Sequence, residues 1–360
     1  MQEDMHYYGT YALARCAGLP IEICQPLAYS AQFVDDSEQS DSQTHEDGGM
    51  LYGIATAHDN VAVVKNQLID HIAQRRVWVP FHFFPGNIGD TLEEKMVCRK
   101  DSDLAREMIA NNVAKAVSAK DYGPYLMGIT AHVYADTFAH YGFSGVSCNY
   151  NKVENNSIRF LNIEESDDIR SYILKKESAF KKLYKRLVSS VGEAASDGLG
   201  HGGVATYPDR PYLCWQFDYQ SHSTLEEEKI RDNQKTYLEA AEKLHAVFLS
   251  YAQQLGLTTG AVEFDVIADK IEEILRVKGS KEERSEAWIE AINRGELFKA
   301  GDERLDYDPE QWSQQKADFA TAPSSAIAAQ SDVYRFHQAA VYHRYYTLKD
   351  LLPRHGITVI

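Results

Sequence analysis

The sequence lacks the marks of a membrane-spanning or exported protein. It contains no run of about 18 apolar residues, the length that a helix needs to cross a bilayer. Its first residues, Met1 to His6, do not combine a basic start with an apolar core, so no secretory signal peptide is evident. These absences predict a cytoplasmic protein with no transmembrane segment. If a signal sequence had been removed from the amino terminus, we would instead expect an exported protein.

Cysteine is scarce, and its spacing fits neither a disulfide framework nor a thiolate metal site. The chain has five cysteines and no CxxC pair. An odd number without paired spacing argues against a disulfide scaffold and against a cysteine-bound zinc ion. Any metal site must therefore use histidine and carboxylate ligands.

Basic charge is also in short supply. Lys and Arg total 37 against 53 Asp and Glu, so the formal net charge is −16 at pH 7. So acidic a surface repels the phosphate backbone of long nucleic acids and anionic membranes. Bound divalent cations would cancel part of this charge locally. The composition disfavours large polyanions as partners and leaves a small phosphoester substrate open.

The composition is that of a folded protein with helical periodicity. Hydrophobic residues make up 44% of 360 residues, and Tyr and Phe are numerous at 22 and 14. We expect an all-α fold, a multi-helix body with long loops, as one domain over residues 1–360. A boundary near 256–260 would divide it into a metal-binding body at 1–255 and C-terminal helices at 256–360. Helices are predicted at 7–16, 20–33, 51–75, 101–117, 123–141, 165–195, 225–254, 260–278, 281–294 and 330–352.

Two segments are predicted to be non-helical. Residues 77–86 are rich in aromatic and β-branched side chains, which favours an extended or irregular conformation. Residues 196–224 hold several glycines and prolines. Long irregular segments of this kind are often functional.

The strongest chemical signal is a stripe of His132, Asp136 and His140 in the apolar segment 123–141. Residues four apart lie one helical turn above each other, so the three side chains share one face. Imidazole nitrogen and carboxylate oxygen are ligands that hydrolytic zinc sites accept. The alternative is a buried polar stripe satisfied by backbone hydrogen bonds. Because such groups are costly to bury unless satisfied together, the metal interpretation is favoured.

Weaker candidates lie elsewhere in the chain. His82 stands between Phe81 and Phe83, where a lone histidine is more often a core residue. Asp35 and Asp36 end an apolar helix, and carboxylates sit poorly at that end without a cation nearby. His6 lies near the start of the first predicted helix.

The order of these residues resembles the zinc-dependent phospholipase C and single-strand nuclease superfamily. That superfamily has an early histidine, a helix ending in Asp, an aromatic-flanked histidine and a helical HxxxD followed by a further histidine. Its motif is HxxxDxxxxxH, whereas the final histidine here comes two residues earlier. Its mature amino terminus ligates a metal. The corresponding residues here are His6, Asp35, His82, His132, Asp136 and His140.

The resemblance implies one to three zinc ions and hydrolysis of a small phosphodiester or phospholipid headgroup. His201 and Asp209 would replace the later ligand pair of the superfamily. Bound ions would lower the pKa of water, and Asp35 or Asp36 would orient that water or act as base. Arg210 would contact a phosphate oxygen, and His58 is a further candidate for substrate contact.

A closer likeness is to an uncharacterised bacterial family with no assigned activity. It rests on Met-His-Tyr-Tyr-Gly-Thr-Tyr-Ala-Leu-Ala at 5–14, on Trp-Val-Pro-Phe-His-Phe at 78–83, and on Ala-His-Tyr-Gly-Phe-Ser-Gly at 139–145. It extends through 201–203 and 208–211 to the segment 337–353.

Two alternatives stay open. The adjacent His58-Asp59 pair is typical of helical HD-type phosphohydrolases, and the test is whether His58 or His82 faces the helix of His132. The other is a non-catalytic protein that binds metal for stability or serves as an interaction scaffold. It would show a closed four-ligand shell with no position for water.

Overall fold

The computed structural model describes residues 1–57, 71–154, 156–189, 200–220, 229–257, 259–299, 301, 303 and 305–359. Most of these residues are helical, which confirms the expected all-α fold. Among them, no helix combines the length and the apolar character that crossing a bilayer requires. All five cysteines are free thiols.

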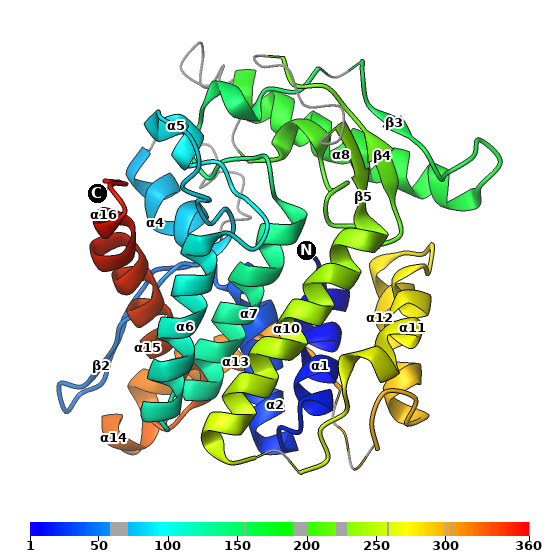
Figure 1. Cartoon of the computed structure of the whole chain (residues 1–360). Helices are drawn as coiled ribbons and strands as arrows, with labels where there is room; N and C mark the ends of the chain where they lie inside the picture. The colour runs from blue at the N-terminus through cyan, green and yellow to red at the C-terminus, as the bar shows by residue number, and fades with distance from the viewer. Residues whose placement is uncertain are drawn as a thin grey trace.

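The helix that carries the histidine stripe lies at the centre of the body. α7 (Gly123–Ala139) is buried along nearly its whole length, because its sequence is apolar on every face. Four helices surround it (Figure 1). They are α2 (Ile21–Asp36), α6 (Asp103–Ser118), α10 (Asn233–Leu255) and α15 (Asp332–Tyr345).

A glycine lets α2 approach α7 closely. A Cβ atom at Gly128 would lie 2.1 Å from the Leu27 carbonyl oxygen, a distance that no side chain can occupy. The two backbones therefore pack nearly in contact. This packing brings the last turn of α2, with Asp35, beside His132 on α7.

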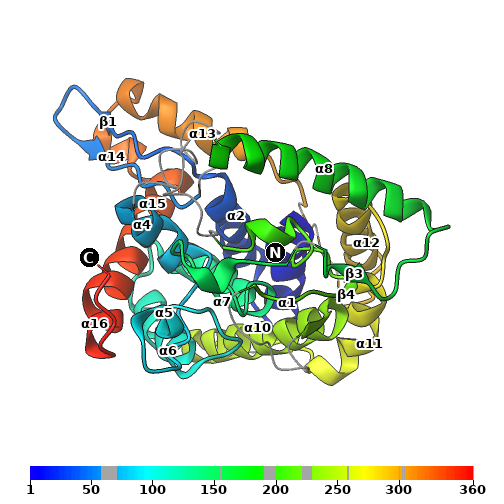
Figure 2. The same ribbon diagram turned by 90° about the horizontal axis from the view of Figure 1, so that it is seen from above.

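The first residues of the chain are held inside the body by a buried ion pair. η1 (Asp4–Gly9) is a π-helical turn that continues into α1 (Thr10–Cys16). Arg284 of α12 (Lys281–Asn293) donates to Asp4 Oδ2 over 2.6 Å and to Gln2 Oε1 over 2.6 Å. Figure 2 shows the amino terminus near the middle of the helical body. Met1 and His6 therefore lie next to α7.

The other elements cover this central bundle or cap its upper end (Figures 1 and 2). Two small antiparallel sheets are present, β1 with β2 and β3–β4–β5. The helices are α4 (His71–Phe81), α5 (Leu92–Lys95), α8 (Asp168–Ser189), α11 (Phe264–Leu275), α13 (Pro309–Ala317), α14 (Ser325–Ala328), α16 (Leu352–Arg354) and the π-helical η6 (Tyr346–Leu351). The 3-10 turns are η2 (Asn149–Asn151), η4 (Gly202–Val204) and η5 (Asp318–Thr321), and the strands are β1 (Gln43–Thr44), β2 (Met50–Leu51), β3 (Arg159–Phe160), β4 (Cys214–Gln216) and β5 (Ile230–Asp232).

Two hydrophobic clusters organise the packing. The larger one draws residues from both sides of position 255, such as Leu13 and Phe336, into one core. The smaller one gathers Phe143, Trp215 and Phe217 around the three-stranded sheet. It supports the loop 200–213, which carries His201 and Asp209.

Three predictions of secondary structure are wrong. The helix expected at 225–254 is wrong at its start, since Ile230–Asp232 form β5 and α10 begins at Asn233, and its residues 225–228 lie outside the described residues. Residues 77–81, expected to be extended, form the last turns of α4. Val77, Val79 and Phe81 are buried and Trp78 is half-buried, so tertiary packing overrides local preference. The helix expected at 51–75 is also wrong at its start, since Leu51 belongs to β2 and residues 52–57 are not helical. Residues 58–70 of that prediction lie outside the described residues.

Candidate metal centre

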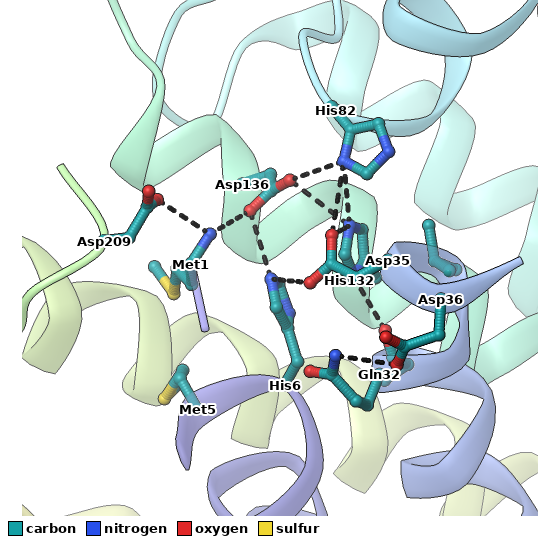
Figure 3. A network of polar contacts seen from close by, with 12 residues as sticks. Met1, Met5, His6, Gln32, Asp35, Asp36, His82, His132, Asp136 and Asp209 are labelled. Atoms are coloured by element: carbon teal, nitrogen blue, oxygen red, sulfur yellow. Dashed lines mark hydrogen bonds and ion pairs between the residues drawn. The ribbon is translucent and has the colours of Figure 1, made fainter. Parts of the chain in front are cut away.

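The stripe on α7 places one carboxylate at the middle of a cluster of imidazoles. Asp136 is 1% exposed. Its Oδ2 atom lies 3.2 Å from His132 Nε2 and 3.4 Å from His82 Nδ1. Its Oδ1 atom lies 3.3 Å from His6 Nε2. Figure 3 shows these side chains converging on Asp136 from three separate segments.

The hydrogen bonds of His82 and His132 fix which ring nitrogens face the cluster. His82 Nε2–H donates to the Thr56 carbonyl over 2.7 Å, and His132 Nδ1–H donates to the Ala31 carbonyl over 2.7 Å. The other nitrogen of each neutral ring then carries a lone pair. Those two nitrogens face each other at 3.3 Å, beside the Asp136 carboxylate. Acceptors facing acceptors in a buried place require a cation between them, either a proton or a metal ion.

The spacing of these atoms suits one tetrahedral ion. Ligands about 2.1 Å from a zinc ion lie about 3.4 Å from one another. The three distances among His82, His132 and Asp136 are 3.2, 3.3 and 3.4 Å. The two rings, whose centroids are 5.1 Å apart, are thus close enough to share an ion.

Asp35 extends the cluster toward solvent. Its Oδ1 atom lies 3.8 Å from both His82 Nδ1 and His132 Nε2, and its Oδ2 atom lies 4.0 Å from His6 Nε2. Burial beside Asp136 raises the pKa of Asp35, although His132 and His82 oppose the shift. The Asp35 side chain is still 32% exposed, so the cluster is accessible from this side.

His6 is held close to the cluster without hydrogen bonds of its own. Its ring stacks on that of His132 with centroids 3.9 Å apart. Neither of its ring nitrogens has a hydrogen-bond partner among the described residues. Burial lowers the pKa of His6 well below 6.5, so the ring is neutral at pH 7. An unprotonated, unpartnered imidazole is suited to accept a metal ion.

The α-amino group of Met1 lies at the same centre. It is 2.5 Å from Asp136 Oδ1 and 3.3 Å from Asp209 Oδ1. Burial opposes the positive charge, but the carboxylates of Asp136 and Asp209 outweigh it and raise the pKa of this amine to about 11. At pH 7 this ammonium carries one positive charge, which offsets part of the negative charge of the two carboxylates.

A further group of ligand-type atoms lies at the end of α7. His140 Nε2 is 3.2 Å from Asp209 Oδ1, and His201 Nε2 is 3.8 Å from Asp209 Oδ2. His140 Nδ1–H donates to the His82 carbonyl and His201 Nδ1–H to the Ala205 carbonyl, over 2.9 and 2.7 Å. In each ring, therefore, one nitrogen is hydrogen-bonded to a backbone carbonyl and the other faces the Asp209 carboxylate. Burial lowers the pKa of His201 to about 4, which leaves this ring neutral at pH 7.

The described residues thus contain three groups of side chains that could hold a metal ion. The donor atoms within each group lie within 4.8 Å of one another. The backbone carbonyls that orient four of the rings are the outer partners typical of metal-ligating histidines. The groups are His6, Asp35 and His132; His82, His132 and Asp136; and His140, His201 and Asp209.

Other candidates from the sequence are placed elsewhere. Asp36 accepts hydrogen bonds from Gln32 over 3.0 Å and from the Tyr307 hydroxyl over 2.5 Å, and it belongs to none of the three groups. It turns away from Asp136 in Figure 3. The test of the HD-type alternative is answered for His82, which faces the helix of His132, whereas His58 lies outside the described residues.

Arg210 is engaged within the smaller hydrophobic cluster. Its guanidinium donates to the Thr206 and Tyr212 hydroxyls over 3.1 and 3.3 Å, and it lies over the Tyr172 ring. The side chain is 3% exposed. These contacts support the loop that carries Asp209.

Fold and site together define an all-α protein with a buried histidine–aspartate centre that could hold metal ions. The chain belongs to the family of unknown function DUF6765, which it matches over residues 1–351. No curated protein and no solved structure matches it. The family match agrees with the expected likeness to an uncharacterised family. It gives no support for the likeness to phospholipase C and nucleases, which remains an expectation.

We expect metal affinity at this centre to rise with pH. Burial lowers the pKa of His82, but Asp136 and Asp35 outweigh that effect and raise it above 6.5 in the metal-free protein. A metal ion must displace this proton, and below the pKa each displaced proton costs about tenfold in affinity per pH unit. Because one proton on His82 is displaced, apparent affinity should rise by up to about tenfold between pH 5.5 and 6.5. Competition with a chromophoric chelator measures it. An affinity independent of pH over this range would contradict the assignment of His82 as a ligand.

Proposed function

We propose that this protein is a metal-dependent hydrolase, with zinc as its ion, that acts on a small phosphodiester or a phospholipid headgroup. One observation carries the proposal. Asp136, which is shared by contacts to His6, His82 and His132, lies where unprotonated ring nitrogens face carboxylates. Either a shared proton or a metal ion would satisfy that arrangement, and the number of buried ligand-type side chains that meet there favours a metal ion.

The donor set supports zinc. All the side-chain ligand candidates are imidazoles or carboxylates, the ligands of catalytic zinc sites. The eight different side chains of the three groups exceed the four ligands that one structural zinc ion needs. The proposed location is the cytoplasm, supported by five free thiols.

The residues of the centre have separable tasks. His132 and His82 would hold the ion in an orientation fixed by the Ala31 and Thr56 carbonyls. When bound, a divalent ion supplies Lewis-acid stabilisation of charge on a phosphoryl oxygen. Asp35, at the accessible side, would accept a proton from an attacking water molecule. Burial raises the pKa of Asp35 above its ordinary value, which makes its carboxylate a stronger base.

The net charge of −16 favours a small substrate over long nucleic acid. The competing function is a non-catalytic, metal-stabilised protein. The near-complete burial of His6, His132 and Asp136 fits that alternative. The 32% exposure of Asp35 favours a centre that a substrate can approach.

Purified protein with its metal content measured should be assayed against a substrate panel. The panel contains bis(p-nitrophenyl) phosphate, p-nitrophenyl phosphate, p-nitrophenyl phosphorylcholine, phosphatidylcholine vesicles and single-stranded DNA. We expect hydrolysis of a small diester or of the choline substrate, lost with chelator and restored by zinc, and little action on DNA. A metal-loaded protein that is inert on every substrate would favour the structural-metal alternative.

A further inference from the structure

A chain of buried hydrogen bonds runs beside the metal centre without belonging to it. It joins α6, α15 and the end of α4 to α7, the helix that each of them contacts (Figure 1). Its side chains are Thr130, Asn112 and His343, and each of them is fully buried. None of the three is a member of the groups of candidate metal ligands. The proposed hydrolysis therefore gives them no chemical task.

Both nitrogens of the His343 ring are engaged in this chain. Burial lowers the pKa of His343 to about 4, so the ring is neutral at pH 7 and carries one N–H. Because a carbonyl can only accept, that hydrogen is on Nε2, which donates to the Pro80 carbonyl over 2.8 Å. Nδ1 then accepts a hydrogen bond from Asn112 Nδ2 over 3.1 Å. The same Asn112 nitrogen also donates to Thr130 Oγ1 over 2.9 Å.

Each end of the chain lies two residues from a candidate metal ligand. Pro80 is in the last turn of α4, and His82 comes directly after that helix. Thr130 precedes His132 on α7. The last carbonyls of a helix have no intrahelical donor, so His343 satisfies the end of α4 at the point where the segment of His82 begins. The hydrogen bonds thus fix the end of α4 relative to α7.

The separation of these two segments decides whether one ion can bind between them. His82 Nδ1 lies 3.3 Å from His132 Nε2, and the two residues are 50 positions apart, so only tertiary contacts hold that distance. A displacement of about 1 Å is enough to spoil a site of this kind. The Thr56 and Ala31 carbonyls orient the two rings, whereas the chain of hydrogen bonds holds the backbone segments that carry them.

We propose that His343 is a positioning residue for the metal centre, which holds the end of α4 against α7 so that His82 and His132 can share one ion. The inference rests on the metal binding in the proposed function, but not on hydrolysis. It differs in its consequence from a role in folding alone. A histidine that only stabilised the fold would change the free energy of unfolding and leave the affinity for metal unchanged.

The test compares zinc affinity, from competition with a chromophoric chelator, with the melting temperature of the metal-free full chain. His343→Leu removes both hydrogen bonds of the ring and should weaken zinc binding about three- to tenfold, less than the loss of a direct outer partner. His343→Gln, whose amide can still donate to the Pro80 carbonyl, should recover part of that affinity. Cobalt(II) bound in place of zinc should show a changed visible spectrum in His343→Leu, because the spectrum depends on ligand geometry.

The chain offers a matched control in His245→Leu. His245, on α10, is 3% exposed, and one of its ring nitrogens lies 2.9 Å from the Val262 carbonyl oxygen. It is thus another buried histidine that contacts a backbone carbonyl, and it belongs to none of the three groups of candidate ligands. Its substitution should lower the melting temperature while leaving zinc affinity and the cobalt spectrum unchanged.

The proposal is wrong if His343→Leu lowers zinc affinity no more than His245→Leu does, a result that would leave the metal centre itself intact. Should His343→Leu not fold, Thr130→Val removes the other end of the chain with little change of shape. That variant should weaken zinc binding about twofold or more, and an unchanged affinity would equally overturn the proposal. Wild-type protein that binds no zinc would overturn both proposals, whereas zinc-loaded protein without hydrolytic activity would leave this one standing.

Discussion

Asp136→Asn is expected to weaken metal binding at the centre by more than about 100-fold and to abolish hydrolytic activity with it. Loss of an outer-shell partner already costs 10- to 100-fold at metal sites, and Asp136 would be a direct ligand. Asparagine keeps the shape of the side chain but removes its charge. The exchange affects every contact that Asp136 makes, with the Met1 amine and His6 on one oxygen and with His82 and His132 on the other.

The chain offers a matched control in Asp36→Asn. Asp36 is also a carboxylate near the centre, but Gln32 and Tyr307 hold it outside the three groups. Its substitution should leave metal content unchanged. Elemental analysis of each purified variant, with titration against a competing chelator, provides the comparison. Full metal content in Asp136→Asn, or equal losses in both variants, would show that the central ligand is wrongly assigned.

Removing the metal ions should lower the melting temperature by several degrees. An ion that binds only the native state, present at about 1,000 times its Kd, stabilises that state by about 4 kcal/mol. The effect should be large here because removal leaves buried carboxylates and imidazoles without their ion, and a proton between His82 and His132 would replace only part of its charge. Calorimetry before and after chelation, and after zinc is restored, measures the change.

Asp136→Asn provides the internal control for that experiment. With little metal to lose, this variant should unfold at nearly the same temperature with and without chelator. If the wild-type protein contains zinc by elemental analysis but its melting temperature does not change with chelator, the ions lie elsewhere on the surface. A large shift with no measurable activity on any substrate would favour the stabilising role.

The sequence predicts the part of the site that lies within one helix. His132 and Asp136 share a face of α7 because helical periodicity is set locally, and His140, directly after the end of α7, lies 3.5 Å from Asp136 Oδ2 through Nδ1. His82 and Asp35 are predicted as ligands only from their order in the chain and from the superfamily resemblance. Local periodicity cannot predict contacts between residues that are 50 or 100 positions apart. The outer contacts of the rings with the Ala31 and Thr56 carbonyls depend on the same tertiary packing.

Two adjacent acidic residues show why the other contacts of the site could not be predicted from the sequence. Asp35 and Asp36 are adjacent acids, yet only Asp35 faces α7, because consecutive residues of a helix point about 100° apart. Sequence alone could not fix the rotation of α2 against α7. The fold class followed from periodicity, whereas α4 was misjudged at 77–81 because burial rather than intrinsic preference makes that segment helical.

His201 and Asp209 illustrate a third limit. They lie in an irregular loop whose position depends on the smaller hydrophobic cluster. At Gly200 the backbone has φ +52°, and a Cβ atom there would lie 2.5 Å from the Phe83 ring. That close approach holds the loop against the segment that carries His82. Glycine content indicated irregular structure, but not which partner the loop would meet.

The uneven exposure of the centre bears on how quickly ions exchange. Asp35 is 32% exposed and His201 17%, whereas His6 and His132 are fully enclosed. An ion can then enter or leave mainly past Asp35 and His201. Its bonds to the protein ligands must break one after another as it leaves. Where exchange is slow, the metal found in a purified sample reflects the growth medium and the order of purification steps rather than the relative affinities of the competing ions. Reconstitution from the unfolded or metal-free state, with the incubation time varied, is therefore needed to compare one metal with another.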